Sequence, residues 1–304
     1  MSKISGIKAI LLSLLISSLL LVLSCTPAGQ TAIQDEAPAT SVQEKAVVTD
    51  VSDECFNFDV LSAEDHVYVD SLLYSSLSNT GLHTFISDLK PMSDIVSFRW
   101  QIEATEEDAH PALQFIDEFV RINHIAAAIS CGPLKTILTP FRNIFDGERY
   151  VQMRVVRQDA FDQSFAAFPE FWSRWAFAEG TDPAIVVQVM EYEERLDRFR
   201  GYGLLYGYPE HAVDFFVDAA AHQAETGEFV ERDFMQMPVV SGRTGMFVYA
   251  VPRGHEKNDA DQDIYNRAQE NVAFFLEHSQ AWYDEYGRFD TSGFLRAVFE
   301  EKGW

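Results

Sequence analysis

The sequence has few basic residues for its length. Its 304 residues include 23 lysines and arginines against 47 aspartates and glutamates, so the formal net charge is −24 at pH 7. A chain this acidic repels other polyanions. We therefore exclude nucleic acid as an expected partner.

The sequence also lacks the motifs that identify common enzyme classes. It contains no GxSxG, no Walker loop and no zinc-finger spacing. Because no complete catalytic set is present, we expect a binding role rather than an enzymatic one, and no cofactor.

The N-terminal apolar run is too short to span a membrane. It extends over fifteen residues, Ala9 to Leu23, which as a helix measure about 22 Å against a hydrocarbon core of about 30 Å. Lys3 and Lys8 flank the start of the run. This pattern is typical of a secretory signal peptide.

The apolar run ends in Val22-Leu23-Ser24-Cys25, followed by Thr26. These residues resemble the lipobox of bacterial lipoproteins. The resemblance implies that residues 1–24 are a signal peptide and that Cys25 becomes the acylated N-terminus, carrying diacylglycerol and a fatty acid such as palmitate. Several acyl chains anchor a protein stably. In Gram-negative lipoproteins a residue other than aspartate after the cysteine, here Thr26, implies the outer membrane.

The segment after the lipobox differs in composition from the rest of the chain. Residues 25–53 are rich in Ala, Thr, Pro and Gln without apolar periodicity, which predicts a disordered tether. The chain is 47% hydrophobic and 13% aromatic overall, so residues 54–304 can form a folded core. We expect one globular domain there, with a possible boundary near residue 180.

Hydrophobic periodicity predicts a helix-rich α+β fold with a few short strands. The expected helices cover 62–78, 111–129, 134–145, 161–177, 209–225, 261–286 and 292–301. The expected strands cover 94–102, 150–157, 184–190 and 246–251.

Two cysteines, Cys55 and Cys131, remain once Cys25 is acylated. In an oxidising compartment such a pair most simply forms a disulfide, and the long loop it closes predicts a stabilisation of roughly 4 kcal/mol. The alternative makes Cys131 a nucleophile beside a histidine such as His124, although no cysteine-hydrolase signature surrounds it.

The helix predicted at 209–225 carries a polar stripe on an otherwise apolar surface. His211, Asp214, Asp218 and His222 recur at spacings of three and four residues, which places them within an arc of about 80°. The stripe either faces solvent or lines a cleft. In a cleft these residues could ligate one divalent metal ion or act as a carboxylate-oriented general base.

The segment that opens the helix at 261–286 partly matches a calcium-binding loop. Asp259, Asp261 and Asp263 occupy ligand positions, but Ile264 stands where the loop needs glycine. We interpret these residues as acids that favour a helix N-terminus. Near the other end, Trp282, Tyr283 and Tyr286 form an aromatic group, expected to pack in the core but also able to stack on sugars or a peptide.

These observations predict an outer-membrane-anchored lipoprotein of the cell envelope. Its domain, periplasmic or on the cell surface, would bind a small ligand or an envelope protein. The alternative is a hydrolase-type enzyme that uses His211, Asp214, Asp218 and His222, with or without a divalent metal ion.

Overall fold

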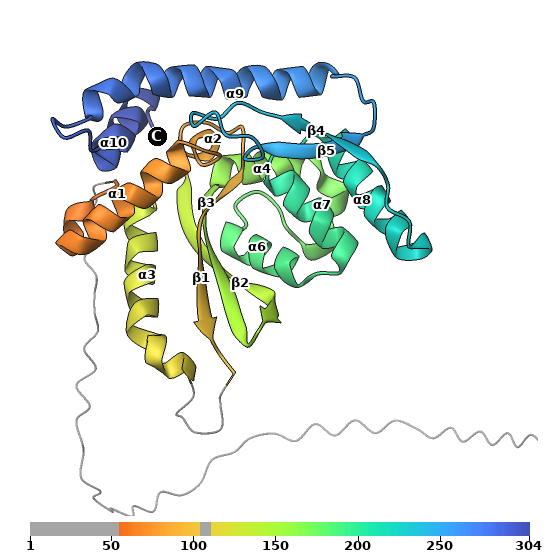
Figure 1. The fold of residues 1–304 in the computed structure, drawn as a ribbon, viewed down its shortest axis with the longest axis horizontal. Coiled ribbons are helices and arrows are strands. Elements are labelled where there is room, and N and C mark those ends of the chain that lie inside the picture. The colour runs from red at the N-terminus through yellow and green to blue at the C-terminus, as the bar shows by residue number, and fades with distance from the viewer. Residues whose placement is uncertain (1–54, 104–110) are drawn as a thin grey trace, which may run out of the picture. The chain divides into compact units, whose positions relative to one another are not determined.

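The computed structural model describes residues 55–103 and 111–304, which have the predicted helix-rich α+β fold. They contain ten α-helices and two small antiparallel sheets, arranged as Figure 1 shows. The predicted signal peptide, the acylated Cys25 and the predicted tether at 25–53 lie outside the described residues.

The larger sheet has the strand order β1-β3-β2, so β3 is its central strand. The strands are β1 (Met92–Gln101), β2 (Leu134–Phe145) and β3 (Glu148–Arg157). Because side chains alternate along a strand, Met153 and Val155 belong to one hydrophobic cluster and Val156 belongs to another. Strand β3 is therefore covered on both faces, and its last seven residues are all buried.

Residues 134–145 form strand β2 rather than the helix predicted for them. Asp146 and Gly147 have positive φ angles of 51° and 74° and connect β2 to β3. A two-residue turn with positive φ at both positions matches the twist of the two strands that it connects. The strand tolerates Pro140 because it lies at the sheet edge, where its pairing with β3 is irregular.

One hydrophobic cluster joins this sheet to helices from both ends of the described chain. These helices are α1 (Ala63–Leu77), α2 (Leu82–Phe85), α3 (Ile116–Ile129), α9 (Asp259–His278) and α10 (Thr291–Lys302). The Ser62 hydroxyl caps α1 by accepting the Asp65 N–H, at the start of the helix predicted over 62–78. The helix predicted at 261–286 ends earlier, at His278, and a 3₁₀ turn over Ser279–Trp282 follows it.

The second cluster packs the other face of the sheet against α4 to α8, and Figure 1 shows α6 and α7 on that side. These helices are α4 (Gln158–Ala167), α5 (Pro169–Trp172), α6 (Pro183–Tyr192), α7 (Arg195–Leu205) and α8 (Glu210–Thr226). The single helix predicted at 161–177 is wrong, because a new helix begins at Pro169. Members of this cluster lie on both sides of residue 180.

The strand predicted at 184–190 is also wrong, since these residues lie in α6. The Asp182 carboxylate accepts the Ala184 N–H, and Pro183 occupies the first turn. This N-cap and first-turn proline favour a helix, and they outweigh the β-branched residues that favour a strand.

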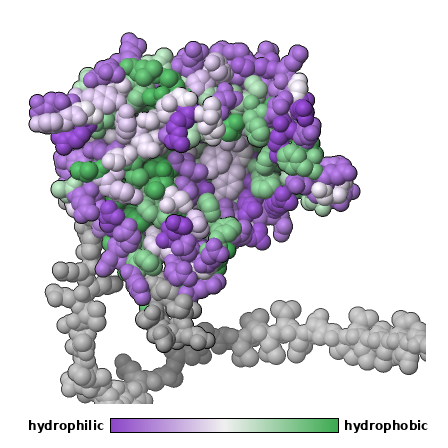
Figure 2. All heavy atoms as spheres, viewed as in Figure 1, coloured by the Kyte–Doolittle hydropathy of each residue, from purple (hydrophilic) through white to green (hydrophobic). Residues whose placement is uncertain are grey.

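The smaller sheet pairs β4 (Arg232–Gln236) with β5 (Val248–Pro252). Strand β5 corresponds to the strand predicted at 246–251. A third hydrophobic cluster packs β5 against α8 and α9, with Ala212, Tyr249 and Ile264 among its members. On the face drawn in Figure 2, hydrophilic residues dominate the outline and hydrophobic residues form patches nearer the middle.

Cys55 and Cys131 form the predicted disulfide, with their Cα atoms 5.2 Å apart across a sequence separation of 76 residues. The bond links the start of the described chain to the segment between α3 and β2. Because the Cys131 sulfur is bonded to Cys55, the alternative in which Cys131 acts as a free nucleophile is wrong.

Replacing both cysteines, Cys55→Ser with Cys131→Ser, is expected to lower the free energy of unfolding by roughly 2–4 kcal/mol, because the unfolded chain regains the freedom of the long loop. Urea denaturation at pH 7 measures the change. The wild-type protein under reducing conditions should show the same loss. Equal stability of oxidised protein and double variant would contradict a structural role for the bond.

Candidate functional site

The four stripe residues predicted on one helix do not converge on one point, although α8 carries all of them. Asp214 forms an ion pair with Arg200, with 2.5 Å between Oδ1 and Nη1. Asp218 is exposed. His222 is also exposed, and its Nε2 atom lies 3.9 Å from a Glu228 carboxylate oxygen. The fourth stripe residue, His211, lies in the first turn of α8 and belongs to a different cluster of polar side chains.

The centre of that cluster is the carboxylate of Asp261, which is fully buried in the first turn of α9. It forms a capping box, because the Asp261 carboxylate accepts the Asn258 N–H and the Asn258 side chain accepts the Asp261 N–H, both at 3.0 Å. The Tyr249 phenol, on β5, donates to Asp261 Oδ1 at 2.6 Å. His255 Nε2 donates to Oδ2 at 2.7 Å. The carboxylate thus joins α9 to β5 and to the loop between them.

His211 brings α8 into the same cluster. Its Nε2 atom lies 3.2 Å from Asp261 Oδ1, yet that buried nitrogen has no hydrogen bond of good geometry with any described residue. The ring stacks on His255, with centroids 5.2 Å apart and planes at 18°. His211 and His255 keep 29% and 15% of their side-chain surface exposed, so solvent reaches the rings but not the carboxylate.

The surroundings of Asp261 stabilise its ionised form. Burial raises the pKa of this carboxyl, but the hydrogen bonds from His255, Tyr249 and Asn258 together with the nearby His211 reverse the effect, and the net pKa lies below its ordinary value. Burial and the bond to Asp261 raise the pKa of Tyr249 well above its ordinary range. Asp261 is therefore an anion and Tyr249 a neutral donor at pH 7.

A fixed carboxylate beside two imidazoles can do two kinds of chemistry. It can orient a histidine as a general base, and it can ligate a metal ion together with the histidine nitrogens. The ligand atoms of His211, His255 and Asp261 all lie within 4.8 Å of one another, so among the described residues these three form a group that could hold a metal.

Replacing Tyr249 by Phe is expected to lower the free energy of unfolding by about 1–3 kcal/mol, because a buried carboxylate loses a hydrogen-bond donor. Urea denaturation at pH 7 measures the loss. Tyr286→Phe is the matched control, since Tyr286 is 76% exposed and should change the stability by less than about 0.5 kcal/mol. Equal effects of the two substitutions would contradict the role assigned to this hydrogen bond.

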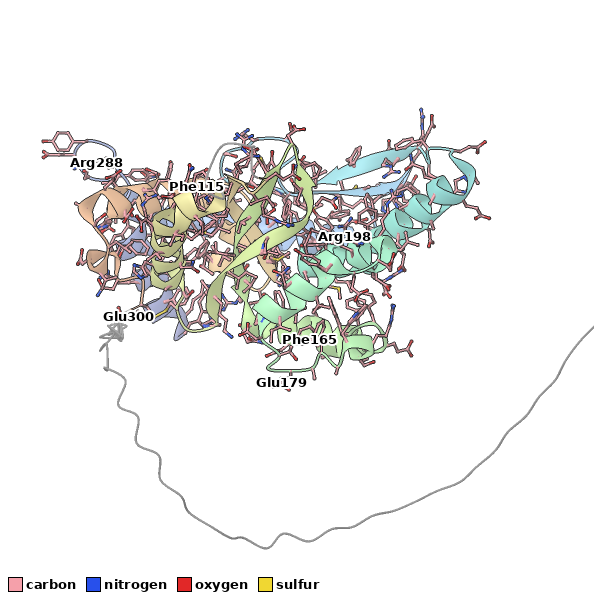
Figure 3. The ribbon with its side chains drawn as sticks, turned by 90° about the horizontal axis from the view of Figure 1, so that it is seen from below. Phe115, Phe165, Glu179, Arg198, Arg288 and Glu300 are labelled. Carbon is pink, nitrogen blue, oxygen red and sulfur yellow. A yellow bond between two sulfur atoms is a disulfide. The ribbon has the colours of Figure 1, made fainter. Side chains whose placement is uncertain are left out.

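A separate pocket of about 530 Å³ opens between α1 and the segment that links α9 to α10. It is lined by His66, Val67, Asp70, Ser71, Tyr74, Trp282, Asp284, Gly287, Arg288, Phe289 and Asp290. Figure 3 shows Arg288 on a loop that projects at one end of the molecule. The volume falls within the range typical of small-molecule sites.

The pocket combines aromatic walls with an excess of negative charge. Tyr74, Trp282 and Phe289 supply the rings, and three carboxylates face one guanidinium, that of Arg288. Arg288 is already occupied, because it forms an ion pair with Asp284 at 2.7 Å. The pocket therefore favours a positively charged occupant.

Asp70 is the carboxylate in this pocket whose ionisation is disfavoured. Burial is the main reason that its pKa lies above the ordinary value; the Asp290 charge adds to the rise, whereas His66 and Thr291 oppose it. His66 Nε2 lies 3.5 Å from Oδ2, and the buried Oδ1 has no hydrogen bond of good geometry with any described residue. A ligand with a positive charge would stabilise the ionised form of Asp70.

The sequence patterns identified some of these residues but not their groupings. Trp282 belongs to the aromatic group and His211 to the polar stripe that the sequence shows. His66 and Asp70 stand four residues apart on α1, a spacing that could have drawn attention to them. His255 has no comparable signal, because its partners come from other segments of the chain.

Comparisons of the chain with protein-family models, with curated proteins and with solved structures find no match. Among the described residues, no helix combines the length and the apolar composition needed to cross a bilayer. The geometry of the two sites is therefore the basis for a functional assignment.

Proposed function

We propose that this protein is a lipid-anchored receptor of the bacterial cell envelope that binds a small organic cation in the pocket between α1 and the segment that links α9 to α10. The observation that carries the binding role is the pocket itself, where Trp282, Tyr74 and Phe289 stand beside carboxylates that exceed the available positive charge. The binding needs no chemical step, in keeping with the lack of a complete catalytic motif in the sequence.

Aromatic rings and carboxylates attract an organic cation by complementary means. The faces of tryptophan and tyrosine carry partial negative charge and attract an ammonium group, by up to about 2 kcal/mol when it is desolvated. Asp70 and Asp290 add full charges. A neutral molecule of the same shape would gain only the contact with the rings.

The lipid anchor rests on the N-terminal pattern, which ends in Leu23-Ser24-Cys25. The Cys55–Cys131 disulfide supports export, because disulfides persist in oxidising compartments. Acylation of Cys25 and residence in the outer membrane follow from the resemblance to lipoproteins. Mass spectrometry of the protein from its native envelope tests the anchor, with an acylated N-terminal Cys25 as the expected result and an uncleaved leader as the contrary one.

The alternative function, a hydrolase that uses the stripe on α8, has less support. Asp214 is paired with Arg200, and both Asp218 and His222 are exposed. Catalysis by these residues as a set would need them to share a cleft with a substrate.

Choline and its neutral isostere 3,3-dimethylbutan-1-ol test the choice of ligand class. We expect choline to bind at one site and the isostere to bind about tenfold more weakly or not at all, because only choline is charged. Isothermal titration calorimetry measures both affinities. Trp282→Ala should weaken choline binding about tenfold, whereas Tyr286→Ala, outside the pocket lining on the same segment, should not. Equal affinity for the two compounds, or no binding of choline, would contradict the proposal.

The affinity for choline is expected to fall as the pH is lowered. Only the ionised form of Asp70 attracts a cation, and the pKa of Asp70 lies above its ordinary value, so protonation removes the attraction at a higher pH than for an exposed aspartate. Titrations between pH 7.5 and pH 4.5 measure this dependence. Asp70→Asn should bind weakly with a flatter profile, and Glu64→Gln, an exposed change on the same helix, should keep the wild-type profile. An unchanged profile in Asp70→Asn would exclude Asp70 as the group responsible.

A further inference from the structure

We propose that His211, His255 and Asp261 bind one divalent transition-metal ion of the zinc type. These residues come from the first turn of α8, from the loop after β5 and from the first turn of α9. The set shares only His211 with the stripe predicted from the sequence.

The spacing of the donor atoms suits one small ion. Ligand atoms about 2.0–2.2 Å from a tetrahedral zinc ion lie about 3.3–3.6 Å from one another. His211 Nε2 and Asp261 Oδ1 are already 3.2 Å apart, and the three ligand atoms lie within 4.8 Å of one another. His255 Nε2 needs to leave its hydrogen bond to Asp261 Oδ2 and turn toward the same point.

The clearest sign of a missing partner is the Nε2 atom of His211. It is buried and faces a carboxylate oxygen, yet it makes no hydrogen bond of good geometry with the described residues. A buried polar atom without a partner costs free energy. A metal ion placed between this nitrogen and the Asp261 carboxylate would satisfy both.

Metal ligands are usually held in place by hydrogen bonds from neighbouring groups, and Asp261 has such bonds. Tyr249 donates to Oδ1 and the Asn258 N–H donates to Oδ2. Each carboxylate oxygen accepts two hydrogen bonds or one bond and one metal ion, so these donors can stay while the ion binds. Such outer partners fix the orientation of the ligands.

The donor set identifies the class of ion. Two imidazole nitrogens and one carboxylate oxygen suit Zn²⁺ and its transition-metal neighbours, whereas Ca²⁺ and Mg²⁺ prefer oxygen ligands only. Three protein ligands leave a position for water or for an exchangeable ligand. The partial exposure of both histidine rings allows an ion to enter from solvent.

The metal site is independent of the cation pocket, because Asp261 lies in the first turn of α9 and Trp282 of the pocket follows its last turn. Figure 1 shows the course of α9 between these two ends. The twenty residues of this helix span about 30 Å. A failure of one proposal therefore leaves the other intact.

Titration of untagged, chelator-treated protein with ZnCl₂ tests the proposal. Calorimetry should show one Zn²⁺ per chain, and a saturating concentration of about 100 times Kd should raise Tm by about 5 °C or more. His211→Ala and His255→Ala should each weaken binding by roughly 100-fold or more. His222→Ala is the matched control, since it removes an exposed histidine from the same helix α8, and it should bind like the wild type.

Two variants and a spectroscopic readout keep the test decisive if one substitution unfolds the protein. Circular dichroism checks the fold of each variant, and the visible spectrum of the Co²⁺-loaded wild type reports histidine and carboxylate coordination without any substitution. Absence of Zn²⁺ binding, or binding that both histidine variants retain, would overturn the proposal. The cluster would then be a structural contact in which Asp261 hydrogen-bonds to Tyr249 and His255 while His211 of α8 stacks on His255.

Discussion

The buried carboxylate of Asp261 is the interaction on which the C-terminal half of the structure depends. Removing a charged group from water costs several kcal/mol unless its hydrogen-bonding capacity is met. Here the compensating groups come from different segments, with Tyr249 on β5 and His255 in the following loop. The anion can therefore be buried only when these segments are assembled, which couples the start of α9 to the small sheet.

Helix α9 extends from Asp261, in its first turn, toward the cation pocket beyond its last turn. Arg267 pairs with Asp88 at 2.7 Å, and the Asn271 side chain donates to the Ser87 hydroxyl at 2.7 Å. These contacts fix the helix against the segment that follows α2. The 3₁₀ turn at its end then places Trp282 opposite α1. The start of the helix thus serves one site, and its far end serves the other.

Local patterns predicted the elements whose signals are local. Strands β1 and β3 alternate clearly, and Ser62 marks the start of α1. The apolar pattern predicts a helix where β2 lies, although Asp146-Gly147 is a strong hairpin signal. It predicts a strand where α6 lies, although Asp182-Pro183 is a strong helix start. In both segments the turn or cap residues at the end of the element indicate its type better than the apolar residues within it.

The candidate sites were less predictable because they depend on contacts between distant segments. The sequence explains Asp261 as an acid at a helix N-terminus, and the capping box bears this out. Nothing local indicates that the same carboxylate meets Tyr249 and His255. Lys90 is a similar case: the backbone carbonyl of Tyr206 and the ring of Phe247 enclose its ammonium group, and burial lowers the pKa of Lys90 to about 7. Only the assembled fold reveals either environment.

The variant Asp261→Asn tests most directly whether the buried carboxylate organises this half of the structure. The substitution keeps the size of the side chain and removes its charge. We expect a loss of about 3 kcal/mol in the free energy of unfolding, together with faster amide hydrogen exchange in β5 and the first turn of α9 while the β1-β3-β2 sheet keeps its protection. Wild-type stability and unchanged exchange in β5 and α9 would contradict the account.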